Sequence, residues 1–253
     1  MSKFLKLVLI LSLIIIASCN NKKTNNLPVV KNEIVKSYLD SSSNYKLSIS
    51  ERTQILRKAI KINSTIDNKI DQIKNNHKIS FEFYDLENME EYKNVNEEAL
   101  SIAEKFGDSL LTAKSNYLVG LYYRENNFEK ALKYFNESEL IYSDVDRKNL
   151  IKKEKYSYNY GKVLLDIAQI LKSVKNYTES ENYTIRAINN FKLAEKYNYM
   201  HISYNNLGII AKNLGRFDDA VKYFQKSIDY SNDTNSKVIN EILGFNNIGT
   251  VYK

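Results

Sequence analysis

The chain has 253 residues, and its composition excludes several classes of protein. It contains one cysteine, one proline, seven glycines and no tryptophan. A single cysteine excludes an intrachain disulfide scaffold. So little glycine and proline is also atypical of β-sandwiches, barrels, propellers and Gly-rich phosphate loops. Hydrophobic residues make up 43% and charged residues 26% of the chain, as in globular proteins with a core. Helices with short connections are therefore expected.

The formal net charge is +7. Two of the basic residues, Lys3 and Lys6, precede an apolar N-terminal run, and elsewhere lysines alternate with glutamates, as in residues 152–155. Mixed charges of this kind solvate a surface, whereas nucleic-acid binding needs a continuous basic stripe along the phosphates. We therefore expect no nucleic-acid partner for this chain.

Residues 1–18 have the layout of a secretory signal peptide. Positive residues precede the apolar run at 7–16, and two small residues, Ala17 and Ser18, follow it directly before Cys19. The apolar run is shorter than the about 20 residues with which a helix spans a membrane. Cleavage of this segment is therefore expected.

The residues around the cleavage point resemble the lipobox of bacterial lipoproteins, since residues 16–19 read Ile-Ala-Ser-Cys. The resemblance implies that Cys19 carries a diacylglycerol and a further acyl chain such as palmitate, which together hold a protein on a membrane. The alternative is an incidental or buried thiol behind an ordinary signal or an uncleaved anchor.

Residues 19–32 are predicted to form a flexible tether, because they are rich in Asn and Lys and contain the only proline, Pro28. In lipoproteins of the Bacteroidetes type, an acidic run after the cysteine resembles a surface-export signal, and no such run follows Cys19. A periplasm-facing position is favoured, on the outer rather than the inner membrane.

A period of about 40 residues organises residues 33–253. Apolar residues recur at helical spacing, and Ser48 and Glu51 form a capping box before one such segment. Two series of small residues keep the period: Ala59, Ala99, Ser138, Ala187 and Ser227, then Ser80, Gly120, Ala168, Gly208 and Gly249. One interval in each series is longer, which predicts an insertion between Ser143 and Tyr160 as extra helical turns.

The most complete copy of the pattern lies near the C-terminal end. It reads Tyr204-x2-Leu207-Gly208, then Gly215-Arg216-Phe217, then Ala220-x3-Phe224, and Phe245-x2-Ile248-Gly249-x2-Tyr252 repeats its first part. Over residues 50–253 this pattern resembles the tetratricopeptide repeat, or TPR. The copies depart from the family pattern in their longer period, in Ala211 at the place of a tyrosine, and in Ser180 and Thr184 at the places of an alanine and an aromatic residue.

The resemblance implies an all-α fold, a right-handed α-solenoid of TPR-like helical hairpins. Gly208 and Ala220 are predicted where the two helices of a hairpin approach each other, and Tyr204, Phe217 and Phe224 are predicted to fill the space around them.

No catalytic or metal-binding constellation is found. The two histidines, His77 and His201, are far apart in the repeat order, and neither has a second ligand one helical turn away. Acidic pairs such as Glu90 with Glu91 are adjacent on a predicted helix, so their side chains diverge. We expect no enzyme activity, no metal and no cofactor.

In TPR proteins such as kinesin light chains and the peptide-sensing regulators of Gram-positive bacteria, asparagines of the first helices bind peptide backbone in a concave groove. The resemblance implies the same for amides in corresponding places here, and Lys212, Arg124 and Lys172 are expected to hold an acidic ligand end. The candidate amides are Asn116, Asn205, Asn206, Asn246 and Asn247. The alternative is that these amides only solvate the groove or cap neighbouring groups.

Residues 242–253 read as a first helix without a second one, so the last repeat is predicted to be incomplete, with an unmatched apolar face. Truncation is favoured over cover by a partner. The sequence therefore predicts a membrane-anchored, non-catalytic scaffold or sensor that binds a protein or peptide. The alternative is the N-terminal sensory fragment of a longer signalling regulator with a histidine kinase or DNA-binding output.

Overall fold

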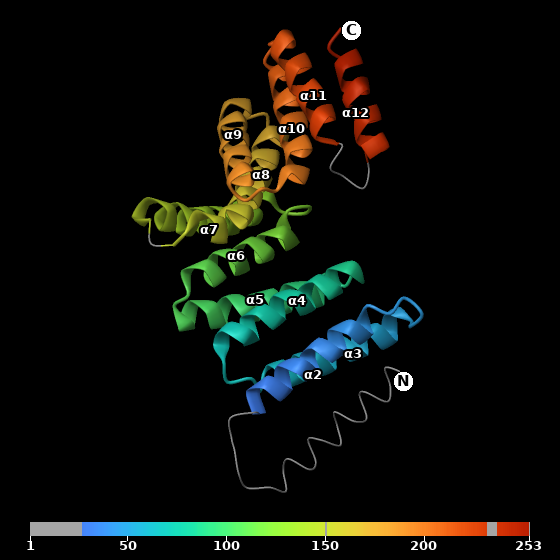
Figure 1. The fold of residues 1–253 in the computed structure, drawn as a ribbon, viewed down its shortest axis with the longest axis vertical. Coiled ribbons are helices and arrows are strands. Elements are labelled where there is room, and N and C mark those ends of the chain that lie inside the picture. The colour runs from blue at the N-terminus through green and yellow to red at the C-terminus, as the bar shows by residue number, and fades with distance from the viewer. Residues whose placement is uncertain (1–26, 150, 232–236, 253) are drawn as a thin grey trace, which may run out of the picture. The chain divides into compact units, whose positions relative to one another are not determined.

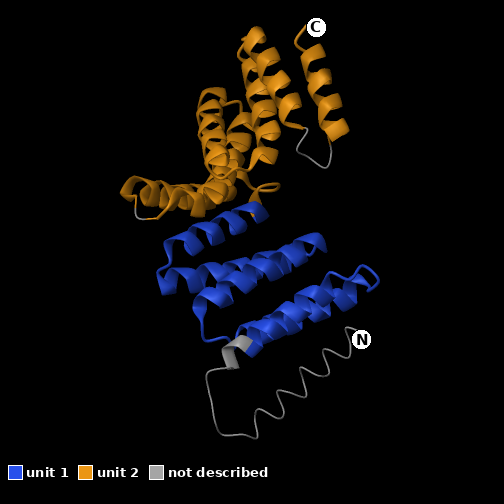
Figure 2. Ribbon diagram, viewed as in Figure 1, with its two compact units in different colours: residues 1–122 blue, residues 123–253 orange. Residues whose placement is uncertain are grey.

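The computed structural model describes residues 27–149, 151–231 and 237–252. Within these ranges every regular element is a helix, and the predicted fold class, an all-α array of TPR-like helical hairpins, is confirmed (Figure 1). The predicted signal peptide and Cys19 lie outside the described residues. The chain divides into two compact units, residues 1–122 and 123–253, and each is described by itself (Figure 2).

The helices of unit 1 pack in sequence order. The first four form two hairpins, α2 with α3 and α4 with α5, and α4 also packs against both helices of the first hairpin. The bounds are α2 Leu27–Ser42, α3 Ile49–Asn63, α4 Lys69–Asp85, α5 Met89–Phe106 and α6 Ser109–Tyr123, whose last residue belongs to unit 2.

The helix α2 begins inside the segment that the sequence predicts as a tether, so residues 27–32 are helical. The proline that suggested a flexible segment is the second residue of this helix. A proline is compatible with the first turn of a helix, because the backbone N–H that it lacks has no partner within the helix there.

The predicted capping box before α3 is confirmed. The Ser48 N–H donates to Glu51 Oε2 over 2.8 Å, and the Glu51 N–H donates to Ser48 Oγ over 3.3 Å. Each bond satisfies a donor that has no partner within the helix.

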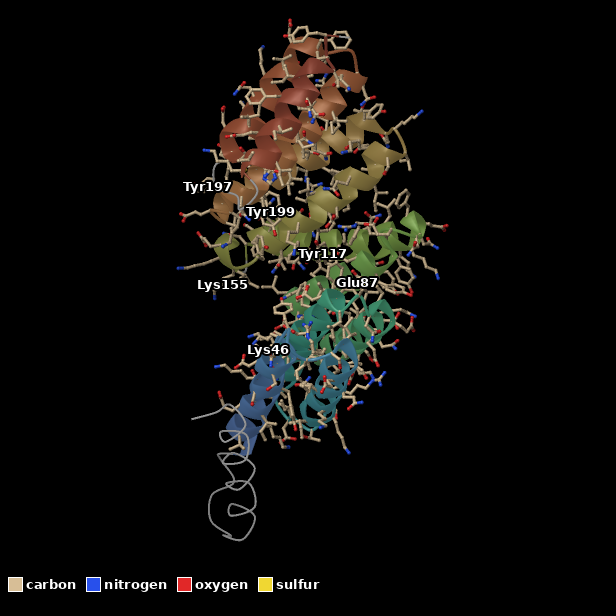
Figure 3. All side chains as sticks on the ribbon, turned by 90° about the vertical axis from the view of Figure 1, so that its right-hand side faces the viewer. Lys46, Glu87, Tyr117, Lys155, Tyr197 and Tyr199 are labelled. Atoms are coloured by element: carbon tan, nitrogen blue, oxygen red, sulfur yellow. The ribbon has the colours of Figure 1, made fainter. Side chains whose placement is uncertain are left out.

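One turn geometry recurs between the two helices of successive hairpins. Glu87, Lys175 and Gly215 have φ values of 56°, 62° and 74°. Each of these residues comes shortly after the end of the first helix of its hairpin. Glu87 is labelled in Figure 3. The N–H of the next residue bonds back to the helix in each case, to Phe83, Leu171 and Ala211. These bonds satisfy carbonyl groups at the helix end.

The core of unit 1 contains the small residues of the first series together with large apolar ones. Ala59 and Ala99 are fully buried, and so are Leu56, Phe83 and Tyr92. The Tyr92 hydroxyl donates to the Leu118 carbonyl over 2.9 Å, which ties α5 to α6. The predicted register of small residues is thus the register of the core.

Unit 1 also buries an amide network that the sequence analysis did not anticipate. Asn63 Nδ2 donates to the Gln72 carbonyl over 2.9 Å and to Asn76 Oδ1 over 2.7 Å. Asn75 Nδ2 donates to Asn63 Oδ1 and to Asn32 Oδ1. Because buried amides cost free energy unless they are bonded, this network favours one alignment of α2, α3 and α4.

His77 lies in the same unit, on α4. The ring is 1% exposed, and its Nε2 lies 2.8 Å from Ser115 Oγ on α6. The pKa of the ring is lowered from 6.5 to about 3, mainly because burial disfavours the charged form and further because of the Lys114 ammonium. His77 is therefore a neutral core residue.

We expect acid to destabilise unit 1 through His77. Between pH 6.5 and about 3 the unfolded chain binds one proton that the folded ring does not. The free energy of unfolding therefore falls by about 1.4 kcal/mol per pH unit as the pH drops through this window. Urea unfolding of His77→Gln measured across the same window should lack this contribution.

The control for this prediction is His201→Gln. The His201 ring is partly exposed at the start of α10, where its Nδ1 lies 2.8 Å from the Asn198 carbonyl. This variant should keep the slope of the unchanged chain. Equal slopes for the chain and His77→Gln would contradict the assignment.

Unit 2 continues the pattern with two complete hairpins, α8 with α9 and α10 with α11, and α12 packs against α11. Two short 3-10 helices, η1 and η2, precede α8 and α10. The bounds are α7 Phe128–Lys148, η1 Lys153–Lys155, α8 Ser157–Ser173, α9 Tyr177–Leu193, η2 Tyr197–Tyr199, α10 Met200–Asn213, α11 Phe217–Ser231 and α12 Lys237–Gly249.

The predicted insertion is only partly helical. The helix α7 has 21 residues, against 17 in α9, and the remainder of the insertion forms the connection that contains η1. Asn149, with φ 50°, ends α7. The Tyr156 hydroxyl donates to Asp146 Oδ1 over 2.6 Å and holds the connection against α7. Because Asn149 has a left-handed backbone conformation, it ends α7 before all of the extra helical turns that the sequence predicts have formed.

The close approach predicted within the α10 and α11 hairpin is confirmed. A Cβ atom at Gly208 would lie 2.5 Å from the Phe224 ring, and Tyr204 and Phe224 are buried. The prediction for Phe217 is wrong, because this side chain is 53% exposed. Phe217 is the first residue of α11 and lies beyond the end of α10, so its helix partner does not cover it.

Candidate functional site

Three cations occupy one register position in unit 2. Arg124, Lys172 and Lys212 each follow a small residue of the second series by four positions. Four residues are about one helical turn, so these side chains lie at the same place on, or directly after, successive first helices. We call Arg124, Lys172 and Lys212 the cation column.

Each cation reaches a residue of the following first helix. Arg124 Nη1 donates to Asp166 Oδ1 of α8 over 2.8 Å. Lys172 Nζ donates to Asn206 Oδ1 of α10, and Lys212 Nζ donates over 3.1 Å to the Thr250 hydroxyl, directly after α12. The column therefore joins neighbouring repeats laterally.

The column keeps an excess of positive charge. Asp166 forms an ion pair with Arg124 and is 7% exposed, whereas an amide and a hydroxyl, which carry no charge, accept from Lys172 and Lys212. Burial lowers the pKa of the Lys172 ammonium. An anion placed beside this ammonium would stabilise its charged form. The face is thus suited to a carboxylate.

Lys162, which also lies on α8, is a further cation of this unit. Burial lowers the pKa of this ammonium, and the Asp166 carboxylate acts in the opposite direction. Its Nζ also lies 5.4 Å from the centre of the Tyr158 ring, within the range of a cation–π contact.

The structure separates the candidate amides into two groups. Asn116 and Asn206 are 5% and 2% exposed. Asn116 Nδ2 donates to the Thr112 carbonyl over 3.3 Å, and Asn206 Nδ2 donates to Thr184 Oγ1 over 3.3 Å while its oxygen accepts from Lys172. Both amides take part in packing between or within helices.

The other amides lie closer to solvent. Asn246 is exposed, and Asn205 and Asn247 are partly exposed. Asn247 Nδ2 donates to Asn205 Oδ1 over 2.7 Å, which links α12 to α10. This bond does not use the Asn205 Nδ2 group, which is a donor, or the Asn247 side-chain oxygen, which is an acceptor. A peptide unit, with its C=O and N–H, needs one donor and one acceptor of this kind.

Sequence reasoning named the three cations but missed their common register and the role of Asp166. The signal was available, because each cation stands at the same distance from its small residue. The acidic partner was not deducible, since Asp166 is one of many carboxylates in the chain and only the packing of helices selects it.

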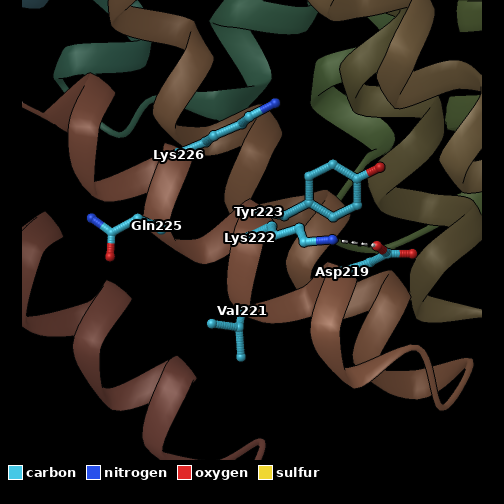
Figure 4. A pocket seen from close by; sticks show the side chains of 6 residues that line it. All are labelled: Asp219, Val221, Lys222, Tyr223, Gln225 and Lys226. Atoms are coloured by element: carbon cyan, nitrogen blue, oxygen red, sulfur yellow. Dashed lines mark ion pairs between the residues drawn. The ribbon is translucent and has the colours of Figure 1, made fainter.

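The described surface also has two open hollows. One, of about 610 Å³, is lined by residues of α11 alone (Figure 4). Lys222 and Asp219 form a 3.8 Å ion pair there. The other lies at the loop after α2, where Lys46 is labelled in Figure 3. Because each is lined by one short segment, neither surrounds a ligand with converging groups.

Metal-ligand groups and membrane-spanning helices were sought in the described part of the chain. No group of three or more His, Cys, Asp or Glu residues in that part of the chain is placed to hold a metal ion. None of the helices there has both the length and the apolar character to cross a membrane.

Comparisons with known proteins agree with the fold. Residues 202–234 match the family model for the tetratricopeptide repeat, and no curated protein matches the chain. Among solved structures, BtubC (BKLC) from P. vanneervenii is similar, with 18% identity and a TM-score of 0.59 over 86% of this chain and 83% of that one.

Two sensor proteins have similar folds over part of their length. One is a signal transduction ATPase with numerous domains and a tetratricopeptide repeat sensor, from Pyrococcus horikoshii, with 16% identity and a TM-score of 0.67 over 88% of this chain and 33% of that one. The other is the apo quorum sensor NprR from B. thuringiensis, with 13% identity and a TM-score of 0.60 over 95% and 63%. The chain thus spans a third of the first and under two thirds of the second, and such identities show a common fold alone.

Proposed function

We propose that this chain is a non-catalytic scaffold or sensor that binds a protein or peptide along α8, α10 and α12. The observation that carries the proposal is the cation column, in which Lys172 and Lys212 have uncharged partners, one on α10 and one directly after α12. A ligand with acidic side chains or a free carboxyl end complements this face.

The exposed amides supply the second half of the binding mode. Asn205, Asn246 and Asn247 lie on α10 and α12, close in sequence to Gly208 and Gly249. Amides bond to peptide backbone without selecting a side chain, and the cations then select for charge. The similarity to a signal transduction ATPase with a tetratricopeptide repeat sensor and to a quorum sensor supports this type of function.

We expect Asn205→Ala combined with Asn246→Ala to weaken ligand binding about tenfold or more, since two backbone contacts are lost. Asn206 and Asn116 are left unchanged, because both are buried and their loss would disturb packing. The measurement is quantitative co-purification of partners from the native membrane. Asn189→Ala, on the exposed side of α9, is the matched control. Retention of every partner by the double variant would remove these amides from the site.

Membrane attachment through lipid on Cys19 is part of the proposal and rests on the lipobox-like sequence. Cys19→Ser should move the protein from the detergent phase to the aqueous phase, because the acyl chains provide the attachment. The lipid mass on the N-terminal peptide gives an independent readout. Unchanged partitioning with no added mass would contradict the anchor.

The second candidate function is the sensory part of a longer signalling regulator with a histidine kinase or DNA-binding output. It is favoured by the comparison in which this fold covers 33% of a signal transduction ATPase whose sensor is a tetratricopeptide repeat. Sequencing the gene beyond the codon for Lys253 separates the two candidates. An output domain in frame supports the regulator, and a stop codon supports the scaffold.

A further inference from the structure

Two tyrosines and two lysines of unit 2 meet between the start of α8 and the connection from α9 to α10. Lys162 Nζ lies 5.4 Å, and Lys196 Nζ lies 5.7 Å, from the centre of the Tyr158 ring. Both distances are within the range of a cation–π contact, so one ring holds two ammonium groups. The Tyr199 hydroxyl lies 2.8 Å from the Tyr158 hydroxyl. We call Tyr158, Lys162, Lys196 and Tyr199 the tyrosine–lysine cluster.

The repeat holds this cluster in place. The Tyr199 ring, labelled in Figure 3, stacks on the buried Phe191 ring with centres 4.9 Å apart. The Lys196 N–H donates to the Phe191 carbonyl over 2.9 Å, and the Lys196 carbonyl accepts from the Tyr199 N–H over 3.1 Å. Groups that are fixed before binding lose little conformational entropy when a ligand arrives.

The two hydroxyl groups of the cluster can offer one donor to a ligand. Each phenol carries one hydrogen, and the bond between Tyr158 and Tyr199 uses only one of the two. Burial raises the pKa of the Tyr158 hydroxyl, and the bond to Tyr199 raises it further, so this group stays protonated at neutral pH. Lys196 is exposed and the other three residues are partly exposed, so a small solute can reach them.

The electrostatics of the cluster favour an anion. The Asp166 carboxylate acts on Lys162, but it is also ion-paired with Arg124 over 2.8 Å. Burial is the larger influence on Lys162 and lowers the pKa of its ammonium. Two ammonium groups beside one ring also repel each other. An anion in contact with both offsets this repulsion and stabilises the charged form of Lys162.

We propose that the tyrosine–lysine cluster binds a phosphate monoester. Such a group carries a charge of about −1.5 to −2 at neutral pH and has three strong acceptor oxygens. These oxygens match two ammonium groups and one phenolic hydrogen, whereas a carboxylate has one charge and two oxygens. The site goes beyond the proposed function, because none of its residues belongs to the cation column or to the candidate amides.

The test is a phosphorus NMR titration of inorganic phosphate with the full chain at mildly alkaline pH. We expect a saturable change of the phosphate resonance. Lys196→Met should weaken binding at least about tenfold, because a hydrogen bond between charged groups is lost, and Lys196→Arg should retain most of it. A second titration with a phosphoserine peptide identifies the source of the phosphate. Tighter binding than that of inorganic phosphate assigns the site to a phosphorylated side chain, and equal or weaker binding assigns it to the free ion.

Lys192→Met is the matched control, because it removes an exposed charge in the last turn of α9 and should leave phosphate binding unchanged. Circular dichroism checks that each variant keeps its helix content. Lys172→Met with Lys212→Met should bind phosphate as the unchanged chain does, so the cluster and the cation column can fail separately. The proposal is overturned by a phosphate resonance without a saturable change, by unchanged affinity of Lys196→Met, or by loss of binding in the cation-column variant.

Discussion

Phe224→Ala is expected to lower the free energy of unfolding by about 3–5 kcal/mol, the usual cost of removing a fully buried phenylalanine. The ring is 1% exposed and lies against the backbone of α10 at Gly208. Its loss opens a cavity in the hairpin that carries the most complete copy of the repeat motif, so the packed structure collapses over it only in part. Urea unfolding followed by circular dichroism measures the change.

Phe217→Ala is the matched control on the same helix. This side chain is 53% exposed, so its removal should cost under about 1.5 kcal/mol. Similar costs for the two variants would show that Phe224 does not hold α10 and α11 together, and the packing described for this hairpin would then be wrong.

Gly208→Ala is expected to destabilise the chain by about 1–3 kcal/mol, against the usual direction. Alanine in place of a helical glycine normally stabilises by about 0.5–1 kcal/mol. Here the added Cβ would lie 2.5 Å from the Phe224 ring, so the ring or one of the two helices must shift. The midpoint of urea unfolding gives the sign directly.

Two further variants isolate the cause. Gly249→Ala adds the same methyl group where no atom lies within 4 Å and should be neutral or stabilising. In the Phe224→Ala background the ring is absent, so Gly208→Ala should lose its cost there, as a double-mutant cycle would show. A stabilising effect of Gly208→Ala in the unchanged chain would contradict the close approach.

The fold was predictable because the same spacing of small residues recurs in successive repeats. Small residues at a constant interval, with Gly208 as the clearest example, predict close helix pairs. The capping box at Ser48 was equally readable, because both partners are local in sequence. Such local and periodic signals do not depend on how the hairpins pack on one another.

The candidate site was predictable only in part, because the exposure of a side chain depends on how neighbouring helices pack. Asn205 and Asn206 are adjacent in sequence, yet the first is partly exposed and the second is 2% exposed between Lys172 and Thr184. The pairing of Arg124 with Asp166 spans 42 positions and depends on which helix follows in space. A sequence alone gives the residue types and the register but not these partners.

The most direct test of the proposed binding face is the affinity of the full chain for acidic and basic peptides. The probes are two pools of labelled decapeptides, one with Asp or Glu and one with Lys or Arg at half of the positions. The proposal predicts that the acidic pool binds, that added salt weakens binding, and that Lys172→Met with Lys212→Met reduces affinity at least about tenfold. Lys222→Met, which removes an exposed charge on α11, should have no effect. Equal affinity for both pools, or unchanged binding by the double variant, would contradict the assignment of α8, α10 and α12 as the ligand-binding face.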